Sequence, residues 1–422
     1  MDDVQTAGAR NLVLAASIAA IFGTASNMAL AENDSLVEKL YEKGVLTEDE
    51  YNELNAKEES ADKDEDPNAM VGSFKGGAPS WESKDGKNSL LLHGRVQVDY
   101  RSSDLPDSTD SFDVRRAYLG VKGKLYDKWT YEITGDWGRD SGPRLEYAYV
   151  DYKWNSAVRA RAGHFKFPFG FSQVTSSRFV DFMERSFTDD FEPGKDQGVM
   201  VYGEPKKKVI SYAVGYANDG GGRASAPDTD TKGLIARGAV NFAPMVNFDK
   251  GVLHLGVDYR DGALAVGPDE FDRKATGLEA VGAYGPFKLQ SEYLTVNLST
   301  DTADNPDVDV YYVNLMWLIT GEQYADSYSL NGMKAIKPLK PLGGGGTGAW
   351  ELGVSLAELD ADQSQKGEDN VKSMTVGLKW IPVTNVRFLL NWVQNDYDTP
   401  IDVGGQPVDK ETQVNGRVQL YF

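Results

Sequence analysis

The segment LLLHGRVQVDY, residues 90–100, decides the fold because its side chains alternate in character with a period of two. Successive side chains of an extended chain point to opposite faces, so this alternation predicts a β-strand with one apolar and one polar face. The polar face carries the charged residues Arg95 and Asp99. One face holds Leu90, Leu92, Val96, Val98 and Tyr100, and the other holds Leu91, His93, Arg95, Gln97 and Asp99.

The same alternation continues to the end of the chain in segments at hairpin spacing. We count sixteen, an even number, as a closed up-and-down barrel of antiparallel strands requires. The expected strands are 90–100, 116–125, 129–137, 146–154, 157–163, 198–203, 208–217, 232–242, 251–260, 275–284, 287–298, 308–318, 349–359, 371–380, 385–394 and 412–422. Three polar stretches, 218–231, 260–274 and 299–307, are expected to be outer loops.

A membrane barrel explains this pattern better than a soluble sandwich does. Almost every strand has the same kind of apolar face, whereas a sandwich would cover that face with a second sheet. Aromatic residues stand at the ends of these faces, which is typical of the girdles at two lipid–water interfaces. The sequence therefore predicts an all-β protein, a sixteen-stranded transmembrane barrel in contact with outer-membrane lipid. The aromatic residues are Trp129, Trp137, Trp154, Tyr259, Trp380 and Trp392.

The last strand carries the most specific local signal. Val414, Gly416, Val418 and Leu420 alternate toward lipid, and Phe422 ends the chain on the same face. A terminal aromatic after such an alternation is the pattern that barrel-assembly machinery recognises, so we expect Phe422 to engage that machinery. This places the protein in the outer membrane of a bacterium.

The N-terminal part has a different character. Residues 1–31 are expected to be a signal peptide, with an apolar core and the pattern Ala29-Leu30-Ala31 before the cleavage point. Residues 32–70 are expected to form a periplasmic helical hairpin and an acidic linker, and residues 71–422 the barrel. Thr47 and Glu50 have the spacing of a capping box for the second helix. The leader is either solvated chain or an association element.

Composition excludes several classes of function. The formal charge is −20, half of it between Glu32 and Asp66, so no nucleic-acid partner is expected. Cysteine is absent. The histidines, His93, His164 and His254, have no metal-ligand spacing, and no G-x-S-x-G motif occurs. We therefore expect no enzyme, no catalytic residue, no metal and no cofactor.

A long insertion, His164 to Gln197, separates the fifth and sixth strands. Loops of this length usually have a function, and one so rich in phenylalanine is unlikely to extend into water. We expect it to fold into the lumen and narrow the channel; the alternative is an outer loop packed on a neighbouring subunit. Its aromatic and cationic residues are Phe165, Phe167, Phe169, Phe171, Phe179, Phe182, Lys166, Arg178 and Arg185.

Several segments together resemble the phosphate- and polyphosphate-selective porins, the porin O and P family. They are LHGRVQVDY around Arg95, DVRRAYLGVKGKLYDKWTYEI, GHFKFPFGFSQVTSSRFVDFMERSFTDDF, NLMWLITGEQYADSYSLNGMKAIKP, GAWELGVSL and the terminal RVQLYF. The resemblance implies a sixteen-stranded, homotrimeric outer-membrane barrel whose third loop folds into the lumen. It also implies a set of pore-lining or anion-binding residues: Arg95, Arg115, Arg116, Tyr118, Ser176, Ser177 and Arg185.

The family's anion site carries over only in part. Two family lysines are replaced, by Thr130 and by Gln173. A phosphate trap needs several charge-assisted donors that converge on one anion, so their loss should weaken phosphate selectivity. Inward carboxylates at other depths of the pore offset the positive potential that the arginines create. We therefore expect a weak preference for anions over cations. These carboxylates are Asp99, Glu132, Asp136 and Asp151.

The sequence thus predicts a passive diffusion channel for small hydrophilic solutes and ions, with anions such as phosphate as candidate solutes. The alternative is a structural barrel, a tether or adhesin with little role in transport. Single-channel conductance separates the two, because a plugged tether passes no ions.

Overall fold

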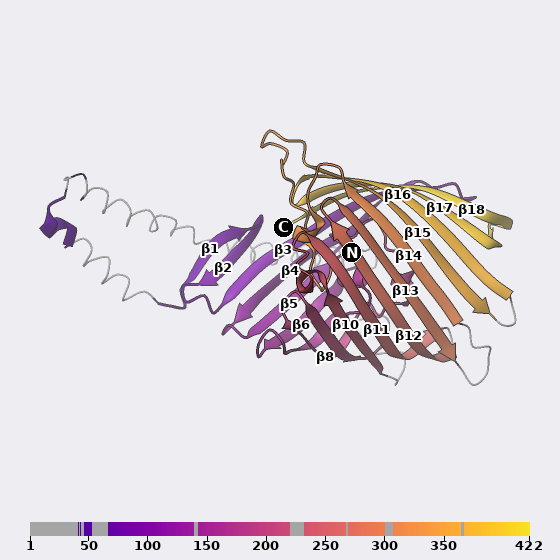
Figure 1. The fold of residues 1–422 in the computed structure, drawn as a ribbon, viewed down its shortest axis with the longest axis horizontal. Coiled ribbons are helices and arrows are strands. Elements are labelled where there is room, and N and C mark those ends of the chain that lie inside the picture. The colour runs from indigo at the N-terminus through magenta and orange to yellow at the C-terminus, as the bar shows by residue number, and fades with distance from the viewer. Residues whose placement is uncertain are drawn as a thin grey trace, which may run out of the picture. The chain divides into compact units, whose positions relative to one another are not determined.

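The computed structural model describes residues 41, 43, 46–52, 66–138, 142–219, 232–266, 269–299, 307–363 and 367–422. Within these residues, sixteen strands form a closed antiparallel barrel, β3 to β18, in which each strand pairs with the next (Figure 1). The barrel closes between β18 and β3, from Gln413 opposite Ser103 to Tyr421 opposite Arg95. The strands are β3 (Ser89–Ser103), β4 (Ser111–Leu125), β5 (Trp129–Asp136), β6 (Arg144–Lys153), β7 (Arg159–Lys166), β8 (Lys195–Lys206), β9 (Ile210–Ala217), β10 (Gly233–Asn241), β11 (Gly251–Val266), β12 (Asp269–Tyr284), β13 (Phe287–Ser299), β14 (Asp307–Leu318), β15 (Ala349–Gln363), β16 (Gly367–Val383), β17 (Val386–Val403) and β18 (Gln406–Tyr421).

All sixteen expected strands are present, but one expected outer loop is wrong. Residues 260–274 belong mostly to β11 and β12, which stay paired up to Val266 opposite Asp269. Charged residues such as Arg260 and Arg273 broke the apolar alternation there, although both are buried on the inner side of the wall. A strand needs apolar residues only where it faces lipid, so strands can continue beyond the hydrophobic pattern.

The two faces of the wall follow the predicted alternation. On β18, Val418 and Leu420 are exposed, whereas Arg417 and Gln419 point inward and are buried. Aromatic side chains from neighbouring strands stack at one rim, as expected of an interfacial girdle. The stacked or tilted pairs are Trp129–Tyr152, Phe248–Tyr284, Phe287–Trp317, Trp350–Trp380 and Trp380–Phe388, and Tyr152 meets Trp154 edge-on.

The long insertion between β7 and β8 folds into the lumen, as predicted. Pairing extends β7 to Lys166 and starts β8 at Lys195, so the loop itself is 167–194; we call it the constriction loop. It contains the short helices α4 (Phe171–Val174) and α5 (Thr188–Phe191). Backbone amides of the loop donate to inward side chains of distant strands: Gly170 N to Asp258, Ser172 N to Glu292 and Met183 N to Asn391, at 2.6–2.9 Å.

A second connection also enters the barrel, which the sequence analysis did not anticipate. Residues 319–348, between β14 and β15, carry α6 (Tyr324–Ser327); we call them the inner segment. Tyr324 and Leu330 are almost completely buried. Met333 N donates to Thr175 Oγ1 of the constriction loop at 3.0 Å. The inner segment and the constriction loop therefore support each other within the lumen.

Two apolar clusters fill part of the lumen. In the first, the phenylalanines that precede α4 pack against inward apolar residues of β8 to β14, such as Leu294 and Val310. In the second, Phe171 and Phe182 of the constriction loop pack with Tyr324 and Met333 of the inner segment.

The N-terminal part is described only in short pieces. Residues 48–52 are helical, and the predicted capping box is present: Thr47 N donates to Glu50 Oε2 at 2.9 Å, and Glu50 N donates to Thr47 Oγ1 at 3.4 Å. The signal peptide falls outside the described residues. β1 (Met70–Lys75) and β2 (Ala78–Ser83), which the sequence analysis missed, form a hairpin. The 3-10 helix η1 spans Ala243–Met245. No helix among the described residues is long and apolar enough to cross a membrane.

Candidate functional site

The constriction begins with an irregularity in the pairing of β3 with β4. Gln97 is opposite Arg116, but Asp99, two residues further, is opposite Asp113, three residues back along β4. One extra residue on β4 makes this a β-bulge, which breaks the alternation and re-aims side chains. Arg115 can therefore face the lumen beside Arg116, although neighbours on a regular strand face opposite sides. Its Nε lies 3.8 Å from Glu184 Oε1 of the constriction loop.

Asp136 of β5 supports the backbone at this bulge. Its Oδ1 accepts the amide hydrogens of Ala117 and Gly138, at 3.0 and 3.1 Å. Asp136 is fully buried. The sequence analysis expected the Asp136 carboxylate only to oppose the positive charge of the arginines. Its bonds to the backbone show that it also positions Arg115 and Arg116 of β4.

Arg95 lies directly opposite Tyr118 and joins the wall to the constriction loop. Its guanidinium carbon is 4.3 Å from the centre of the Tyr118 ring, a cation–π contact. Its Nη1 donates to Ser177 Oγ at 2.8 Å, and its Nε is buried with no hydrogen-bond partner. Three predicted site residues, Arg95, Tyr118 and Ser177, therefore meet.

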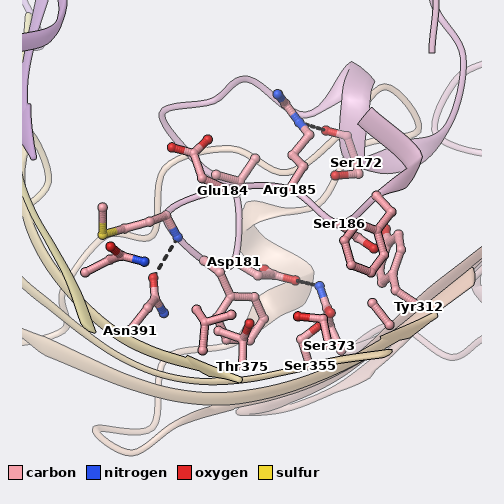
Figure 2. Close-up of a pocket in the computed structure, with 18 of the residues that line it drawn as sticks. Ser172, Asp181, Glu184, Arg185, Ser186, Tyr312, Ser355, Ser373, Thr375 and Asn391 are labelled. Carbon is pink, nitrogen blue, oxygen red and sulfur yellow. Dashed lines mark hydrogen bonds between the residues drawn. The ribbon is translucent and has the colours of Figure 1, made fainter. Parts of the chain in front are cut away.

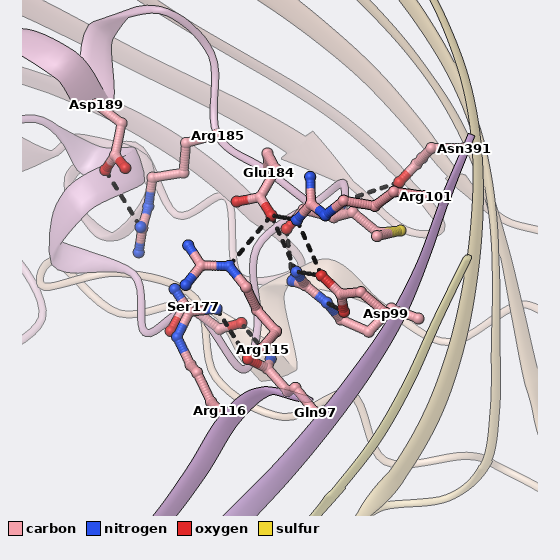
Figure 3. Close-up of polar contacts among 12 residues, drawn as sticks. Gln97, Asp99, Arg101, Arg115, Arg116, Ser177, Glu184, Arg185, Asp189 and Asn391 are labelled. Atoms are coloured by element: carbon pink, nitrogen blue, oxygen red, sulfur yellow. Dashed lines mark hydrogen bonds and ion pairs between the residues drawn. The ribbon is translucent and has the colours of Figure 1, made fainter. Parts of the chain in front are cut away.

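Arg116 stands next to this group. Its Nη1 donates to the carboxamide oxygen of Gln97 at 2.9 Å, and Gln97 Nε2 is 3.5 Å from Ser177 O (Figure 3). Within the described residues, neither Arg95 nor Arg116 pairs with a carboxylate. Both acceptors, a hydroxyl and a carboxamide, are neutral, so the positive charge of the two guanidiniums is left uncompensated at Ser177.

A second arginine group surrounds Glu184 at the tip of the constriction loop. Arg101 Nη2 and Arg417 Nη2 donate to Glu184 Oε1 at 2.5 and 3.0 Å, and Arg115 approaches the same oxygen (Figure 3). Burial opposes ionisation of Glu184, but the surrounding guanidiniums hold the pKa of its carboxyl below the usual range. Asp99 binds Arg101 and Arg417 as well. This group is therefore largely neutralised.

Arg185 and Ser176 have contacts within the constriction loop. Arg185 Nε donates to Ser172 O at 3.0 Å, Nη2 to Thr175 O at 2.9 Å and Nη1 to Asp189 Oδ1 at 3.2 Å. Ser176 Oγ accepts from Arg178 Nε at 3.3 Å. Arg185 thus ties three points of the loop together and already has an acidic partner.

The sequence analysis missed Arg101, Glu184 and Arg417. Arg417 alternates with the lipid-facing residues of the last strand, and Arg101 directly follows the segment 90–100, but nothing local shows that their side chains converge. Of the two residues expected to replace family lysines, Gln173 is buried in α4, where its backbone oxygen accepts from Lys166 Nζ at 2.7 Å. Thr130 lies opposite Asp151 on the inner face of the wall.

Comparison with known proteins places this geometry in context. A family model described as phosphate-selective porin O and P matches residues 91–262 and 258–422. Porin O of Pseudomonas aeruginosa is 26% identical over 361 residues, which cover 70% of this chain and 80% of that protein.

Two solved barrels share the fold at low sequence identity. An anion-selective porin from Comamonas acidovorans superposes with a TM-score of 0.55 at 15% identity. The match covers 79% of this chain and 100% of that porin. The trimer form of OmpT from Vibrio cholerae gives a TM-score of 0.53 at 12% identity. The match covers 79% of this chain and 99% of the OmpT chain.

Proposed function

Because this chain belongs to the phosphate-selective porin O and P family, and so is a porin of the bacterial outer membrane, we propose that it conducts small anions with a weak preference over cations. The observation that carries this proposal is the pair of guanidiniums, Arg95 at Ser177 and Arg116 at Gln97, neither of which has a carboxylate partner among the described residues. Preorganised donors at a narrow passage favour anions over a range set by the Debye length, about 8 Å at physiological salt.

The preference is weak because several other arginines at the constriction are compensated. Glu184 and Asp99 neutralise much of the charge on Arg101, Arg115 and Arg417, and Asp189 pairs with Arg185. A tight phosphate site would need several charged donors aimed at one point. Among the described residues Arg178 also lacks a carboxylate partner, although its Nε donates to Ser176 Oγ. With so few unpaired guanidiniums, inorganic phosphate should pass with modest block or none.

A homotrimer is the assembly we propose. Its support is the family and the trimer form in which OmpT, a barrel of the same fold, has been solved. Membership of a porin family also points to a channel and away from an enzyme. Cross-linking that yields only monomers would contradict the trimer.

The reversal potential in a gradient of KCl tests the selectivity. In the Arg95→Gln/Arg116→Gln variant, the ratio of anion to cation permeability should fall to one or below, because the two uncompensated charges at Ser177 and Gln97 are removed. The control removes the same charge at Lys372 and Lys410, exposed cations that pair with Asp398 and Asp396, and should keep the parent ratio. An unchanged ratio in the arginine variant would refute the proposal, and a parent that passes no current would favour the structural alternative.

A further inference from the structure

A chamber of about 190 Å³ lies between the constriction loop and the wall of β13 to β18 (Figure 2). Its wall side is formed by uncharged polar residues, in contrast to the arginines at Ser177. Asn314, Ser355 and Thr375 are directly opposite one another on β14, β15 and β16, and all three line the chamber. Three adjacent strands therefore present one carboxamide and two hydroxyls in one continuous row across the wall.

One polar atom in this row lacks a partner. Asn314 is only 7% exposed, and its Nδ2 donates to Asp181 Oδ2 at 3.1 Å. A carboxylate only accepts, so this bond fixes the carboxamide orientation and leaves Oδ1 as an acceptor. Asn314 Oδ1 is buried without a hydrogen-bond partner, and so is Ser186 Oγ on the loop side of the chamber. A buried polar atom without a partner is costly, which points to a ligand that supplies donors.

The charged residues that line the chamber are already paired. Asp181 binds Lys288 and Asn314, Glu184 binds Arg101, and Arg185 binds Asp189. A free cation would have no uncompensated carboxylate here. A phosphate anion would find no unpaired cation either, because Arg101 and Arg185, the cations that line the chamber, already bind carboxylates. Hydroxyl groups both donate and accept, and so match the hydroxyls of Ser355 and Thr375 as well as Asn314 Oδ1.

Two apolar side chains also line the chamber: Phe187 of the constriction loop and Met333 of the inner segment. A sugar ring has C–H faces that pack on aromatic and thioether groups, while its hydroxyls form hydrogen bonds around its edge. We propose that this chamber binds neutral polyhydroxylated solutes of monosaccharide size and makes the channel permeable to them, separately from the anion pathway at Arg95 and Arg116. This inference rests on the proposed function in one respect: the channel must be open. It does not depend on the anion preference.

Glucose is the probe for the test. In liposome swelling, the Ser355→Ala/Thr375→Val variant should take up glucose about threefold more slowly than the parent or slower still, since each lost hydrogen bond weakens binding by several-fold. These substitutions do not enlarge the side chains, so the single-channel conductance in KCl should stay at the parent value. The control is Ser291→Ala, because Ser291 lies on the opposite, lipid-facing side of β13 and should alter neither readout.

Three outcomes separate the possibilities. A slower glucose rate with unchanged KCl conductance supports the chamber. An unchanged glucose rate in the double variant overturns it, and so does a parent channel that conducts KCl but excludes glucose. Anion selectivity is measured independently, so loss of the proposed anion preference would leave the glucose result intact, and the two proposals fail separately.

Discussion

Arg417 forms a bidentate ion pair with Asp99: its Nε donates to Oδ1 at 2.6 Å and its Nη2 to Oδ2 at 2.7 Å. The two residues are directly opposite on β18 and β3, the last and first strands of the barrel, and both are buried. Arg417 Nη1 also donates to Met183 O of the constriction loop at 2.6 Å. One side chain therefore links closure of the barrel to the position of the loop.

Breaking this pair should destabilise the barrel. Arg417→Leu leaves the Asp99 carboxylate buried beside a single partial partner, Arg101, and the loss of one member of a buried pair typically costs about 3–5 kcal/mol. Arg417→Leu/Asp99→Leu removes both charges and should recover most of that loss. The temperature at which the barrel loses its heat-modifiable mobility in gels measures the effect. Equal temperatures for the parent and the single variant would contradict this prediction.

Arg185 should act on the shape of the constriction loop more than on selectivity. Arg185→Ala removes bonds to Ser172 O, Thr175 O and Asp189, and each hydrogen bond made by a charged group contributes about 1.5–3 kcal/mol. We expect noisier single-channel current with an anion-to-cation ratio near that of the parent. Lysine cannot reach the three acceptors in one geometry. The single-channel current of Arg185→Lys should therefore be nearly as noisy as that of Arg185→Ala. A large drop in the ratio would instead place Arg185 among the residues that attract anions.

Glu192 should make stability fall as pH rises. It is buried in the constriction loop without a hydrogen-bond partner, and Glu192 Oε1 and Glu292 Oε2 both lie within 2.8 Å of the point where a Cβ on Gly170 would stand. Burial, and then the nearby Glu292, raise the pKa of Glu192 well above its usual value.

The direction of this pH dependence follows from proton binding. The folded state holds the Glu192 proton more tightly than the unfolded chain, where the pKa is about 4.3, so stability is lost as pH rises above that value. Glu192→Gln removes this loss, so the thermal midpoint of the variant should exceed that of the parent by more at pH 9 than at pH 5. Parallel midpoints across this range would show that Glu192 does not titrate in the expected window.

Phe422 should be needed for efficient assembly. Its backbone exchanges two hydrogen bonds of 3.1 Å with Gly94 on β3, and a Cβ on Gly94 would stand 2.5 Å from its ring. Deletion of Phe422 should reduce the amount of heat-modifiable barrel in the outer membrane. Phe422→Ala keeps the backbone bonds and separates their contribution from that of the ring. Unchanged assembly after deletion, at normal expression levels, would refute the role of the terminal aromatic.

The acidic leader should be dispensable for folding of the barrel. Deletion of residues 32–65 leaves all of β3 to β18 in place. We expect the shortened chain to refold in detergent and to show the same heat-modifiable mobility. Failure to refold would make the leader a part of the fold instead of an accessory.

The sequence by itself determined the wall of this protein. A period of two assigns each strand residue to lipid or lumen, and apolar and charged residues alternate strongly enough from 90 to 422 to locate sixteen strands. The same alternation correctly placed Arg95, Asp99 and Arg116 inside. A run of phenylalanines too apolar for water was enough to predict that the loop after β7 turns inward.

Only the tertiary structure decided what those inward residues do. Alternation gives the phase within one strand and says nothing about a bulge, so the pattern could not explain how Arg115 and Arg116 both face the lumen, although the family resemblance implied both as pore residues. Charge compensation depends on contacts across the lumen: Arg417 and Asp99 are 318 positions apart, and Glu184 reaches both Arg101 and Arg417 only because the constriction loop crosses to that wall. Electrostatic pairing depends on distance in space, so the sequence identified the charges while the fold determined which of them remain uncompensated.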